Sequence, residues 1–154
     1  MSDTKVEPIE LYGLCQKGHI KNQFAKIGII GAGVVGREIS LLVSQSGIEV
    51  VILEISEERI IHALSELEMS LNKQIDHWGM TLSEKKLILS RIKCSLNYSN
   101  LTGCDLVIEC IKSKSNDHML DLRRSIFMRI EEYVDNDCII ATNSTAAIIT
   151  ELSS

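Results

Sequence analysis

Apolar residues gather in five short runs between Lys26 and the end of the chain. The runs are residues 26–30, 50–53, 92–96, 106–108 and 138–142. Short runs rich in apolar residues are typical of strands that are buried on both faces of a parallel sheet. The pattern therefore predicts five strands.

Amphipathic stretches separate these runs and predict helices. They cover residues 34–46, 57–78, 83–90 and 117–134. In the first stretch one helix face is predicted to carry Val35, Ile39, Leu42 and Val43. In the longest stretch the corresponding face is predicted to carry Ile60, Leu64, Leu67, Leu71 and Ile75.

The helix ends carry their own signals. Gly47 and Gly79 follow the first two predicted helices, where glycine favours helix termination. Ser56 can cap the second helix, and Glu57 and Glu58 in its first turn suit the positive end of the helix dipole. These signals support the predicted boundaries.

The order of the elements predicts the fold class. Strands that alternate with helices require right-handed βαβ crossovers, which build a doubly wound, mostly parallel sheet. The expected class is therefore α/β. A chain of 154 residues has room for one domain of ordinary size, which we place at residues 25–154. Residues 1–24 show no sustained period and are expected to form a tail or one short helix.

The charge and the hydropathy of the chain exclude two kinds of partner. Its 16 basic and 21 acidic residues leave a net charge of −5, which offers no basic surface to a nucleic acid. No run approaches the roughly 18 to 20 apolar residues of a membrane span. The N-terminus also lacks the pattern of a signal or transit peptide. We expect no membrane partner.

The cysteines indicate a cellular compartment. The chain has five of them: Cys15, Cys94, Cys104, Cys110 and Cys138. Their number is odd and no two form a C-x-x-C pair, so we interpret them as buried thiols of a reducing compartment. No group of histidines, cysteines or carboxylates has metal-ligand spacing. The expected location is cytoplasmic, and no metal is expected.

A glycine motif lies between the first predicted strand and the first predicted helix. Its residues are Gly31, Ala32, Gly33, Val34, Val35 and Gly36, which form G-x-G-x-x-G. In this context the first glycine permits a tight turn, the second lets a pyrophosphate approach the backbone, and the third lets the helix pack on the strand. The N–H groups at the helix start attract phosphates. The motif predicts a Rossmann-type dinucleotide-binding domain; the alternative is a glycine turn used only for tight packing.

Glu54 ends the second predicted strand, 18 residues after Gly36. A carboxylate at this position accepts hydrogen bonds from the adenosine ribose and repels a ribose 2′-phosphate. NAD is therefore the expected cofactor, in preference to NADP. Arg59, the nearby cation, is interpreted as a solvated helix residue. The alternative for Glu54 is an ordinary exposed carboxylate at a strand end.

Three phrases extend this picture to a family. They are residues 26–33 (KIGIIGAG), 106–110 (LVIEC) and 141–152 (ATNSTAAIITEL). Together with the long helix after Glu54, they make residues 26–154 resemble the N-terminal domain of 3-hydroxyacyl-CoA dehydrogenases. The resemblance implies an oxidoreductase of fatty acid metabolism, usually a homodimer through a second, helical domain.

The resemblance also implies roles for single residues. Asn143 and Thr145 correspond to positions near the cofactor and the substrate, with Thr145 in place of a serine. Arg123 corresponds to a lysine that contacts the cofactor. Ser70 and His77 on the long helix correspond to positions that contact coenzyme A, with His77 in place of a lysine.

Two departures from the family pattern concern the active site. The stretch Lys112–His118 is an insertion that replaces an acidic residue near the nicotinamide. The family's catalytic histidine corresponds to a position beyond Ser154. The histidines present, which we interpret as solvated or packed, are His19, His62, His77 and His118. We therefore expect no catalytic residue, and no dehydrogenase turnover, in residues 1–154 alone.

The expected function is the NAD-binding domain of an enzyme that passes hydride from a 3-hydroxyacyl-CoA to NAD. The alternative is a non-catalytic NAD-binding or interaction module that has lost the active site, and a third reading is an interrupted reading frame. The partner of the complete enzyme would be an acyl-CoA. The isolated domain is expected to be a monomer or to expose an apolar patch near Ile148 and Leu152.

Overall fold

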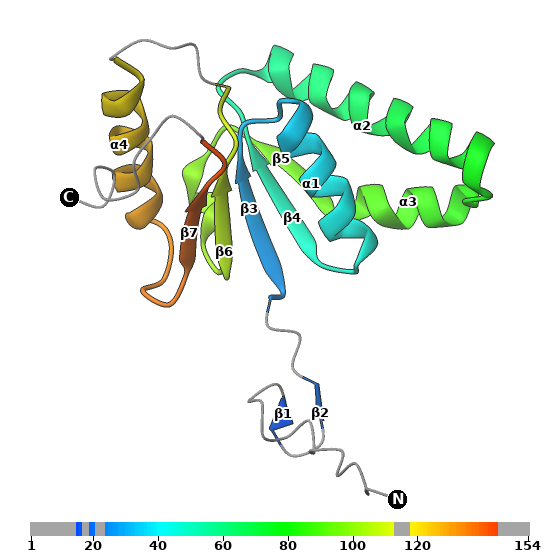
Figure 1. The fold of residues 1–154 in the computed structure, drawn as a ribbon, viewed down its shortest axis with the longest axis horizontal. Helices are drawn as coiled ribbons and strands as arrows, with labels where there is room; N and C mark the ends of the chain where they lie inside the picture. The colour runs from blue at the N-terminus through cyan, green and yellow to red at the C-terminus, as the bar shows by residue number, and fades with distance from the viewer. Residues whose placement is uncertain (1–14, 17–18, 21–23, 113–117, 145–154) are drawn as a thin grey trace, which may run out of the picture.

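A five-stranded sheet forms the centre of the molecule (Figure 1). The computed structural model describes residues 15–16, 19–20, 24–112 and 118–144. The sheet strands are β3 (Lys26–Ile30), β4 (Glu49–Leu53), β5 (Ile92–Ser95), β6 (Leu106–Glu109) and β7 (Ile139–Thr142). They lie in the order β5-β4-β3-β6-β7, and every neighbouring pair is parallel. The predicted α/β class and its five strands are confirmed.

Helices cover both faces of this sheet (Figure 1). They are α1 (Val34–Gln45), α2 (Glu57–Trp78), α3 (Leu82–Ser90), the 3-10 helix η2 (Tyr98–Leu101) and α4 (His118–Glu131). The first three pack on one face, where Ile29, Ile52 and Leu67 are fully buried, and η2 and α4 pack on the other, around Leu101 and Ile130. Alternate residues of the central strands β3 and β4 therefore reach opposite cores, as in a doubly wound sheet.

The chain reverses its winding direction at β3. From this central strand it passes outward through β4 to β5, and then returns to the other side of β3 to form β6 and β7. In open α/β sheets, ligands bind in the crevice outside the carboxyl ends of the strands at such a reversal point. The turn after β3 and the turn after β6 meet there.

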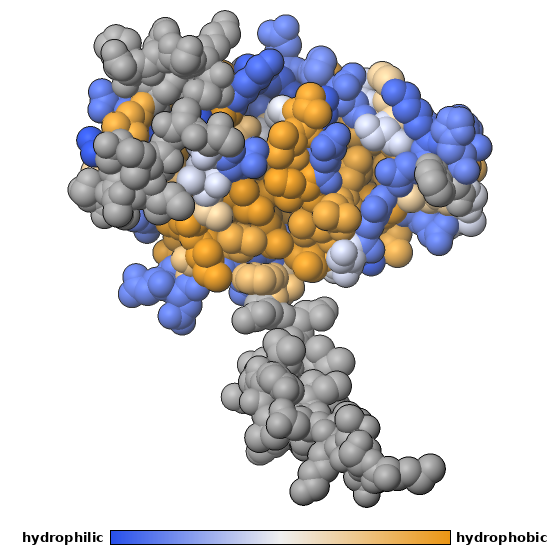
Figure 2. All heavy atoms as spheres, in the orientation of Figure 1, coloured by the Kyte–Doolittle hydropathy of each residue, from blue (hydrophilic) through white to orange (hydrophobic). Residues whose placement is uncertain are grey.

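The apolar faces of α1 and α2 agree with the prediction only in part: Ile39, Val43, Leu67 and Leu71 pack in the core as expected. Val35 and Leu42, predicted to share the apolar face of α1, are 41% and 67% exposed. The buried positions include Ser40 and Ser44 instead, because their hydroxyls donate to the carbonyl oxygens of Gly36 and Ile88 at 2.6 Å each. Figure 2 shows the apolar surface that results on this side of the molecule. In α2 the fully buried stripe is Ala63, Leu67 and Leu71, and Leu64 is 41% exposed.

The helix ends follow the predicted signals. Gly47 and Gly79 adopt positive φ angles of 88° and 72°, which glycine tolerates at a helix end. The Ser56 side chain accepts a hydrogen bond from the Arg59 N–H at the start of α2. A capping box that was not predicted joins Thr81 and Glu84 at the start of α3.

Two very short strands precede the sheet. They are β1 (Cys15–Gln16) and β2 (His19–Ile20), which pair antiparallel. This pair stands within the stretch expected to be a tail or a short helix. None of the helices in the described part of the chain has the length and apolar character needed to span a membrane.

Candidate functional site

The glycine turn joins the end of β3 to the start of α1. Gly31 has a φ of 97°, a backbone conformation that a side chain would strain. A Cβ on Gly36 would lie 2.1 Å from the Gly31 carbonyl oxygen, so α1 can approach β3 only if this residue is glycine. A Cβ on Gly33 would meet nothing within 4 Å. Gly31 is thus required by its backbone conformation and Gly36 by close packing, whereas Gly33 faces open space.

Neighbouring elements hold this turn in place. The Gly31 N–H donates to the Leu53 carbonyl at 2.9 Å, and the Ala32 N–H donates to Glu54 Oε1 at 2.6 Å. Arg37 Nη1 donates to the Ala32 carbonyl at 2.9 Å. The same guanidinium forms an ion pair with Glu66 of α2 at 3.2 Å. Arg37 is a site residue that was not predicted, because its role depends on a contact with Glu66 of α2 that only the fold creates.

The start of α1 is free of side-chain caps. Its N-cap, Gly33, offers no side-chain hydrogen bond, and the first turn has no acidic residue. By contrast, α2 begins with Ser56 followed by two glutamates, and α3 begins with a capping box. The helix dipole at α1 is therefore not offset by a carboxylate of its own first turn, and a phosphate fits such a helix start. Val34 and Val35 beside it are 64% and 41% exposed.

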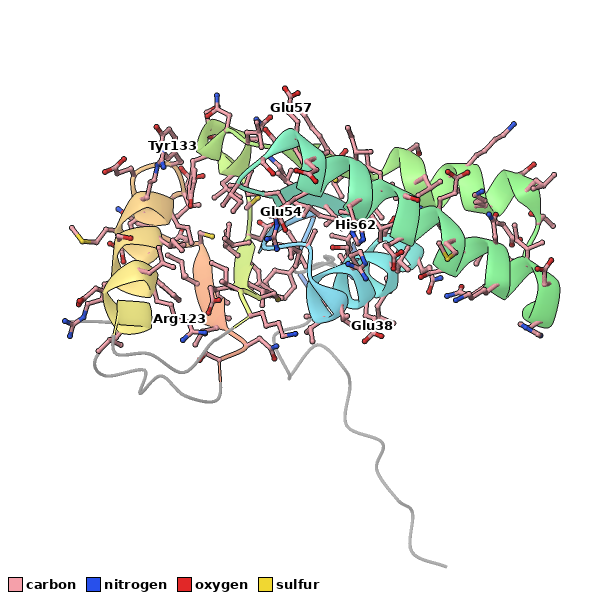
Figure 3. All side chains as sticks on the ribbon, turned by 90° about the horizontal axis from the view of Figure 1, so that it is seen from above. Glu38, Glu54, Glu57, His62, Arg123 and Tyr133 are labelled. Atoms are coloured by element: carbon pink, nitrogen blue, oxygen red, sulfur yellow. The ribbon has the colours of Figure 1, made fainter. Side chains whose placement is uncertain are left out.

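Glu54 lies immediately beside the turn, at the carboxyl end of β4. Its side chain is only 4% exposed, and its second oxygen lies 3.0 Å from Arg59 Nε. The alternative interpretation of Glu54, as an ordinary exposed carboxylate, is thus wrong. Arg59 is also more than a solvated helix residue, because it forms an ion pair with Glu54. Figure 3 shows Glu54 among the elements that meet at this edge.

A second buried carboxylate, Glu109, lies at the end of β6. Its side chain is fully buried and forms an ion pair with Arg123 of α4, from Nε to Oε2, at 3.3 Å. Thr142 at the end of β7 donates its hydroxyl to the same oxygen at 2.6 Å, and the Ile111 N–H donates to the other oxygen at 2.6 Å. Arg123 Nη2 also reaches the Ile111 carbonyl at 3.4 Å. These contacts join α4, β6 and β7 in one polar cluster.

The burial of Arg123 bears on its expected role. Its side chain is 2% exposed, and Figure 3 places it on α4, well away from Glu54. A guanidinium held by Glu109 and Ile111 is not free to reach a ligand unless this ion pair opens. Glu109 and Thr142 were not predicted as partners of Arg123, although a glutamate at the end of an apolar strand is a usable signal.

The segment after β7 is tied to this cluster. The Asn143 N–H donates to the Glu109 carbonyl at 2.8 Å, and the Asn143 residue is exposed. The Ser144 N–H donates to Thr142 Oγ1 at 3.0 Å. Several expected positions lie outside the described residues: Thr145, Ile148, Leu152 and most of the stretch Lys112–His118. The structure therefore brings Asn143 to the same edge as the glycine turn and leaves Thr145 untested.

The positions expected to contact coenzyme A lie on α2. Ser70 is half-buried and His77 is exposed. They are two helical turns apart and so share one face of the helix. His62 is exposed on the same helix. The side chains of His19 and His118 lie outside the described part of the structure.

The described cysteines are free thiols. They are Cys94, Cys104, Cys110 and Cys138, of which Cys104 and Cys110 are buried. Burial raises the pKa of Cys94, Cys104 and Cys110 to about 11 each. Thiols with such pKa values are poor nucleophiles at neutral pH. Within the described residues, no group of three or more histidines, cysteines or carboxylates gathers to hold a metal ion.

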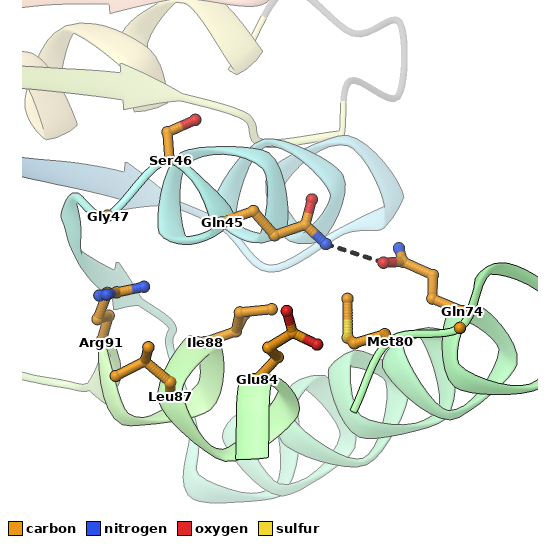
Figure 4. A pocket seen from close by; sticks show the side chains of 10 residues that line it. Gln45, Ser46, Gly47, Gln74, Met80, Glu84, Leu87, Ile88 and Arg91 are labelled. Atoms are coloured by element: carbon orange, nitrogen blue, oxygen red, sulfur yellow. Dashed lines mark hydrogen bonds between the residues drawn. The ribbon is translucent and has the colours of Figure 1, made fainter. Parts of the chain in front are cut away.

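A cavity of 540 Å³ lies between helices, beside the amino ends of β4 and β5 (Figure 4). It is bordered by the end of α1, the end of α2, and α3, and its polar lining includes Gln45, Gln74, Glu84 and Arg91. The Gln45 and Gln74 side chains bridge it with a hydrogen bond of 2.8 Å. None of the lining residues belongs to the glycine turn, so this cavity is separate from the candidate site.

The fold and the glycine turn define a class, the Rossmann-type dinucleotide-binding domains, in which the candidate site is the place where the turn meets the ends of β4 and β6. The chain belongs to the family described as 3-hydroxyacyl-CoA dehydrogenase, NAD binding domain, whose model matches residues 26–154. NAD is the cofactor of this family's domain.

Individual relatives agree with this membership. The chain is 30% identical over 138 residues to the fatty acid oxidation complex subunit alpha of Psychrobacter arcticus, covering 90% of this chain and 18% of that one. It is 29% identical to a 3-hydroxybutyryl-CoA dehydrogenase of Bradyrhizobium diazoefficiens, covering 83% of this chain and 42% of the relative. The crystal structure of (S)-3-hydroxybutyryl-CoA dehydrogenase from Ralstonia eutropha superposes with a TM-score of 0.76 and 31% identity, over 84% of this chain and 44% of that one. The chain thus spans less than half of each of these relatives.

Proposed function

We propose that this chain serves as the NAD-binding part of an oxidoreductase that acts on the 3-hydroxyl of an acyl-CoA. The observation that carries the proposal is the glycine turn at the reversal point of the sheet. There Gly33 leaves open space above an α1 start that has neither a side-chain cap nor an acidic residue. Family membership supports the substrate class, since relatives named for fatty acid oxidation and for 3-hydroxybutyryl-CoA share this domain.

The residues present fit the cofactor. A pyrophosphate would be held by the N–H groups at the start of α1, over Gly33. Glu54, already fixed by the Ala32 N–H, would accept hydrogen bonds from the adenosine ribose. The exposed Val34 and Val35 would be covered by the bound molecule. When bound, NAD supplies the hydride acceptor.

The chain's remaining contribution is orientation. The cluster of Glu109, Arg123 and Thr142 would fix the path of Asn143 and Ser144 beside the nicotinamide. Thr145 would offer a hydroxyl to the substrate, and Ser70 and His77 on α2 would contact coenzyme A. The histidine that takes the proton of the substrate hydroxyl would come from outside residues 1–154.

One calorimetric titration tests cofactor binding. Wild-type protein should bind NADH saturably, and Gly33→Val should bind it at least tenfold more weakly, because the new side chain fills the space over the α1 start. Circular dichroism should show that this variant stays folded, since no atom lies within 4 Å of the added Cβ. A folded wild-type chain that fails to bind millimolar NADH would overturn the proposal.

A non-catalytic module is the second candidate, and one observation favours it. Arg123, at the position of a cofactor-contacting lysine in the resembled family, is buried against Glu109. Held in this ion pair, the guanidinium would not make the cofactor contact that the resembled family assigns to the lysine. A longer protein that binds NADH but never oxidises 3-hydroxybutyryl-CoA would decide for the module.

We further propose a cytoplasmic location and a monomeric state for this chain by itself. Free thiols at Cys94, Cys104, Cys110 and Cys138 suit a reducing compartment. Dimerisation would then depend on the remainder of the enzyme. A sedimentation run that shows a tight dimer of residues 1–154 would contradict the monomeric state.

A further inference from the structure

Both carboxylate oxygens of Glu54 are engaged in the structure. Oε1 accepts from the Ala32 N–H at 2.6 Å, and Oε2 accepts from the Ile55 N–H at 3.2 Å. Oε2 also lies 3.0 Å from Arg59 Nε. The negative charge that would repel a ribose 2′-phosphate is therefore balanced by a guanidinium in direct contact with it.

Arg59 is far more exposed to solvent than Glu54, its ion-pair partner. The Arg59 side chain is 58% exposed, whereas that of Glu54 is 4% exposed. Because the ion pair uses Nε, the two terminal nitrogens of the guanidinium remain outside it. Among the described residues, the Arg59 side chain has no other ion pair. Its outer edge is thus available to a ligand at the carboxyl end of β4.

The exposed side of the Arg59 guanidinium is chemically suited to bind a phosphate. Guanidinium groups bind phosphate oxygens with two parallel donors, and an arginine near the ribose-binding carboxylate is the usual means of accepting a 2′-phosphate. The start of α2 adds little to this attraction, because Ser56 caps it and Glu57 and Glu58 stand in its first turn. Both glutamates are exposed, so solvent screens their charges, and the attraction rests on the guanidinium of Arg59.

We propose that Arg59 determines the cofactor preference of this site. It offsets Glu54 and takes the 2′-phosphate of NADP, so the site accepts both dinucleotides with a modest preference for NAD. The inference rests on the proposed function, because it requires a dinucleotide bound over the glycine turn.

The test compares two ligands on the full chain. NADH and NADPH are titrated by calorimetry into the wild type, Arg59→Gln and Lys86→Gln. Lys86 is an exposed residue of α3, which does not belong to the candidate site. Its variant therefore removes one positive charge outside the site. The wild type should bind NADPH within about tenfold of NADH, since one charge-assisted contact is worth about tenfold in affinity.

Arg59→Gln should weaken NADPH binding about tenfold and NADH binding less than about threefold, because only NADPH carries the phosphate. Lys86→Gln should change neither.

Three results would overturn the inference. In the first, the wild type binds NADH and excludes NADPH, and Arg59→Gln changes nothing. In the second, Arg59→Gln weakens both dinucleotides equally, which would make Arg59 a general support for Glu54. In the third, neither dinucleotide binds to the folded wild type, which overturns the proposed function as well. The NADH titration of the wild type separates this last case from the other two.

Discussion

Glu109 of β6 and Arg123 of α4 form an ion pair that is closed to solvent, with side chains 0% and 2% exposed and a nitrogen-to-oxygen distance of 3.3 Å. The pair joins α4, which begins at His118, to the central sheet. Ion pairs of this kind are costly to break, because removal of one partner leaves an uncompensated charge in the interior.

Arg123→Met should therefore destabilise the protein by about 3–5 kcal/mol, since it leaves the Glu109 carboxylate buried without its cation. The double variant Arg123→Met/Glu109→Gln should recover part of that loss, because no full charge stays buried. Urea unfolding monitored by circular dichroism measures both values. Equal stabilities for the single and double variants would show that the two residues are not coupled.

Thr142→Val should cost about 1–2 kcal/mol, because its hydroxyl both donates to Glu109 and accepts from the Ser144 N–H. Thr142→Ser keeps the hydroxyl and serves as the matched control. In an NMR spectrum, the amide signals of Asn143 and Ser144 should move in the valine variant and stay close to wild type in the serine variant. An unchanged Ser144 signal in Thr142→Val would contradict the contact.

Two alanine substitutions in the glycine turn should differ sharply in their effects on stability. Gly36→Ala should prevent stable folding, because the added Cβ would lie 2.1 Å from the Gly31 carbonyl oxygen. Gly33→Ala should stay within about 1 kcal/mol of wild-type stability, since Gly33 has an ordinary φ of −65° and open space around it. Thermal unfolding monitored by circular dichroism compares the two variants. A Gly36→Ala protein with wild-type stability would contradict the close approach of α1 to β3.

The Asp105 carboxyl group should make the free energy of unfolding depend on pH. The N–H groups of Lys26 and Ala25 donate to its carboxylate and lower its pKa below the ordinary value. A carboxyl group with a lowered pKa in the folded state contributes stability that is complete above its unfolded pKa and is lost as pH falls through the folded value.

The control for this effect is Asp105→Asn, which keeps an acceptor oxygen and removes the charge. At pH 7 it should be about 0.5–1 kcal/mol less stable than wild type, because hydrogen bonds to a charged group are the stronger ones. The difference should shrink below about pH 4, where the unfolded carboxyl group of the wild type takes up its proton. A constant difference from pH 7 to pH 2 would refute the assignment.

The thiols should resist alkylation in the folded protein. Cys94, Cys104 and Cys110 have pKa values raised to about 11 by burial, so the reactive thiolate is scarce at pH 7.5. A Cys15→Ser variant, treated with iodoacetamide and weighed by mass spectrometry, should react much faster in urea than in buffer. Rapid native labelling at any of these three positions would contradict their burial.

The sequence predicted those features that depend on local pattern. The five strands were recognised because each is a short apolar run, and Gly79 ends α2 as its position suggested. The buried face of α1 was predicted only in part. Ile39 and Val43 pack on the core as expected, but Ser40 and Ser44 are buried through hydrogen bonds to Gly36 and Ile88 that no hydropathy pattern reveals. The helix η2 is too short to produce a period.

The candidate site, too, could be predicted only where the local sequence pattern was sufficient. The glycine turn was identified from residue types and spacing alone. The partners of Arg37, Arg59 and Arg123 were not, because each arginine contacts a glutamate from a different element of the fold. Side chains of this length have many reachable partners, so only the tertiary structure selects one.

The hydrogen bonds that fix the glycine turn bear on how fast a ligand can be captured. Leu53, Glu54 and Arg37 hold the turn in one shape through contacts that belong to the protein itself. An arriving dinucleotide does not need to wait for the turn to fold, and little backbone entropy is lost on contact. Encounter would then be governed by diffusion and orientation, and the lifetime of the complex by the contacts made afterwards.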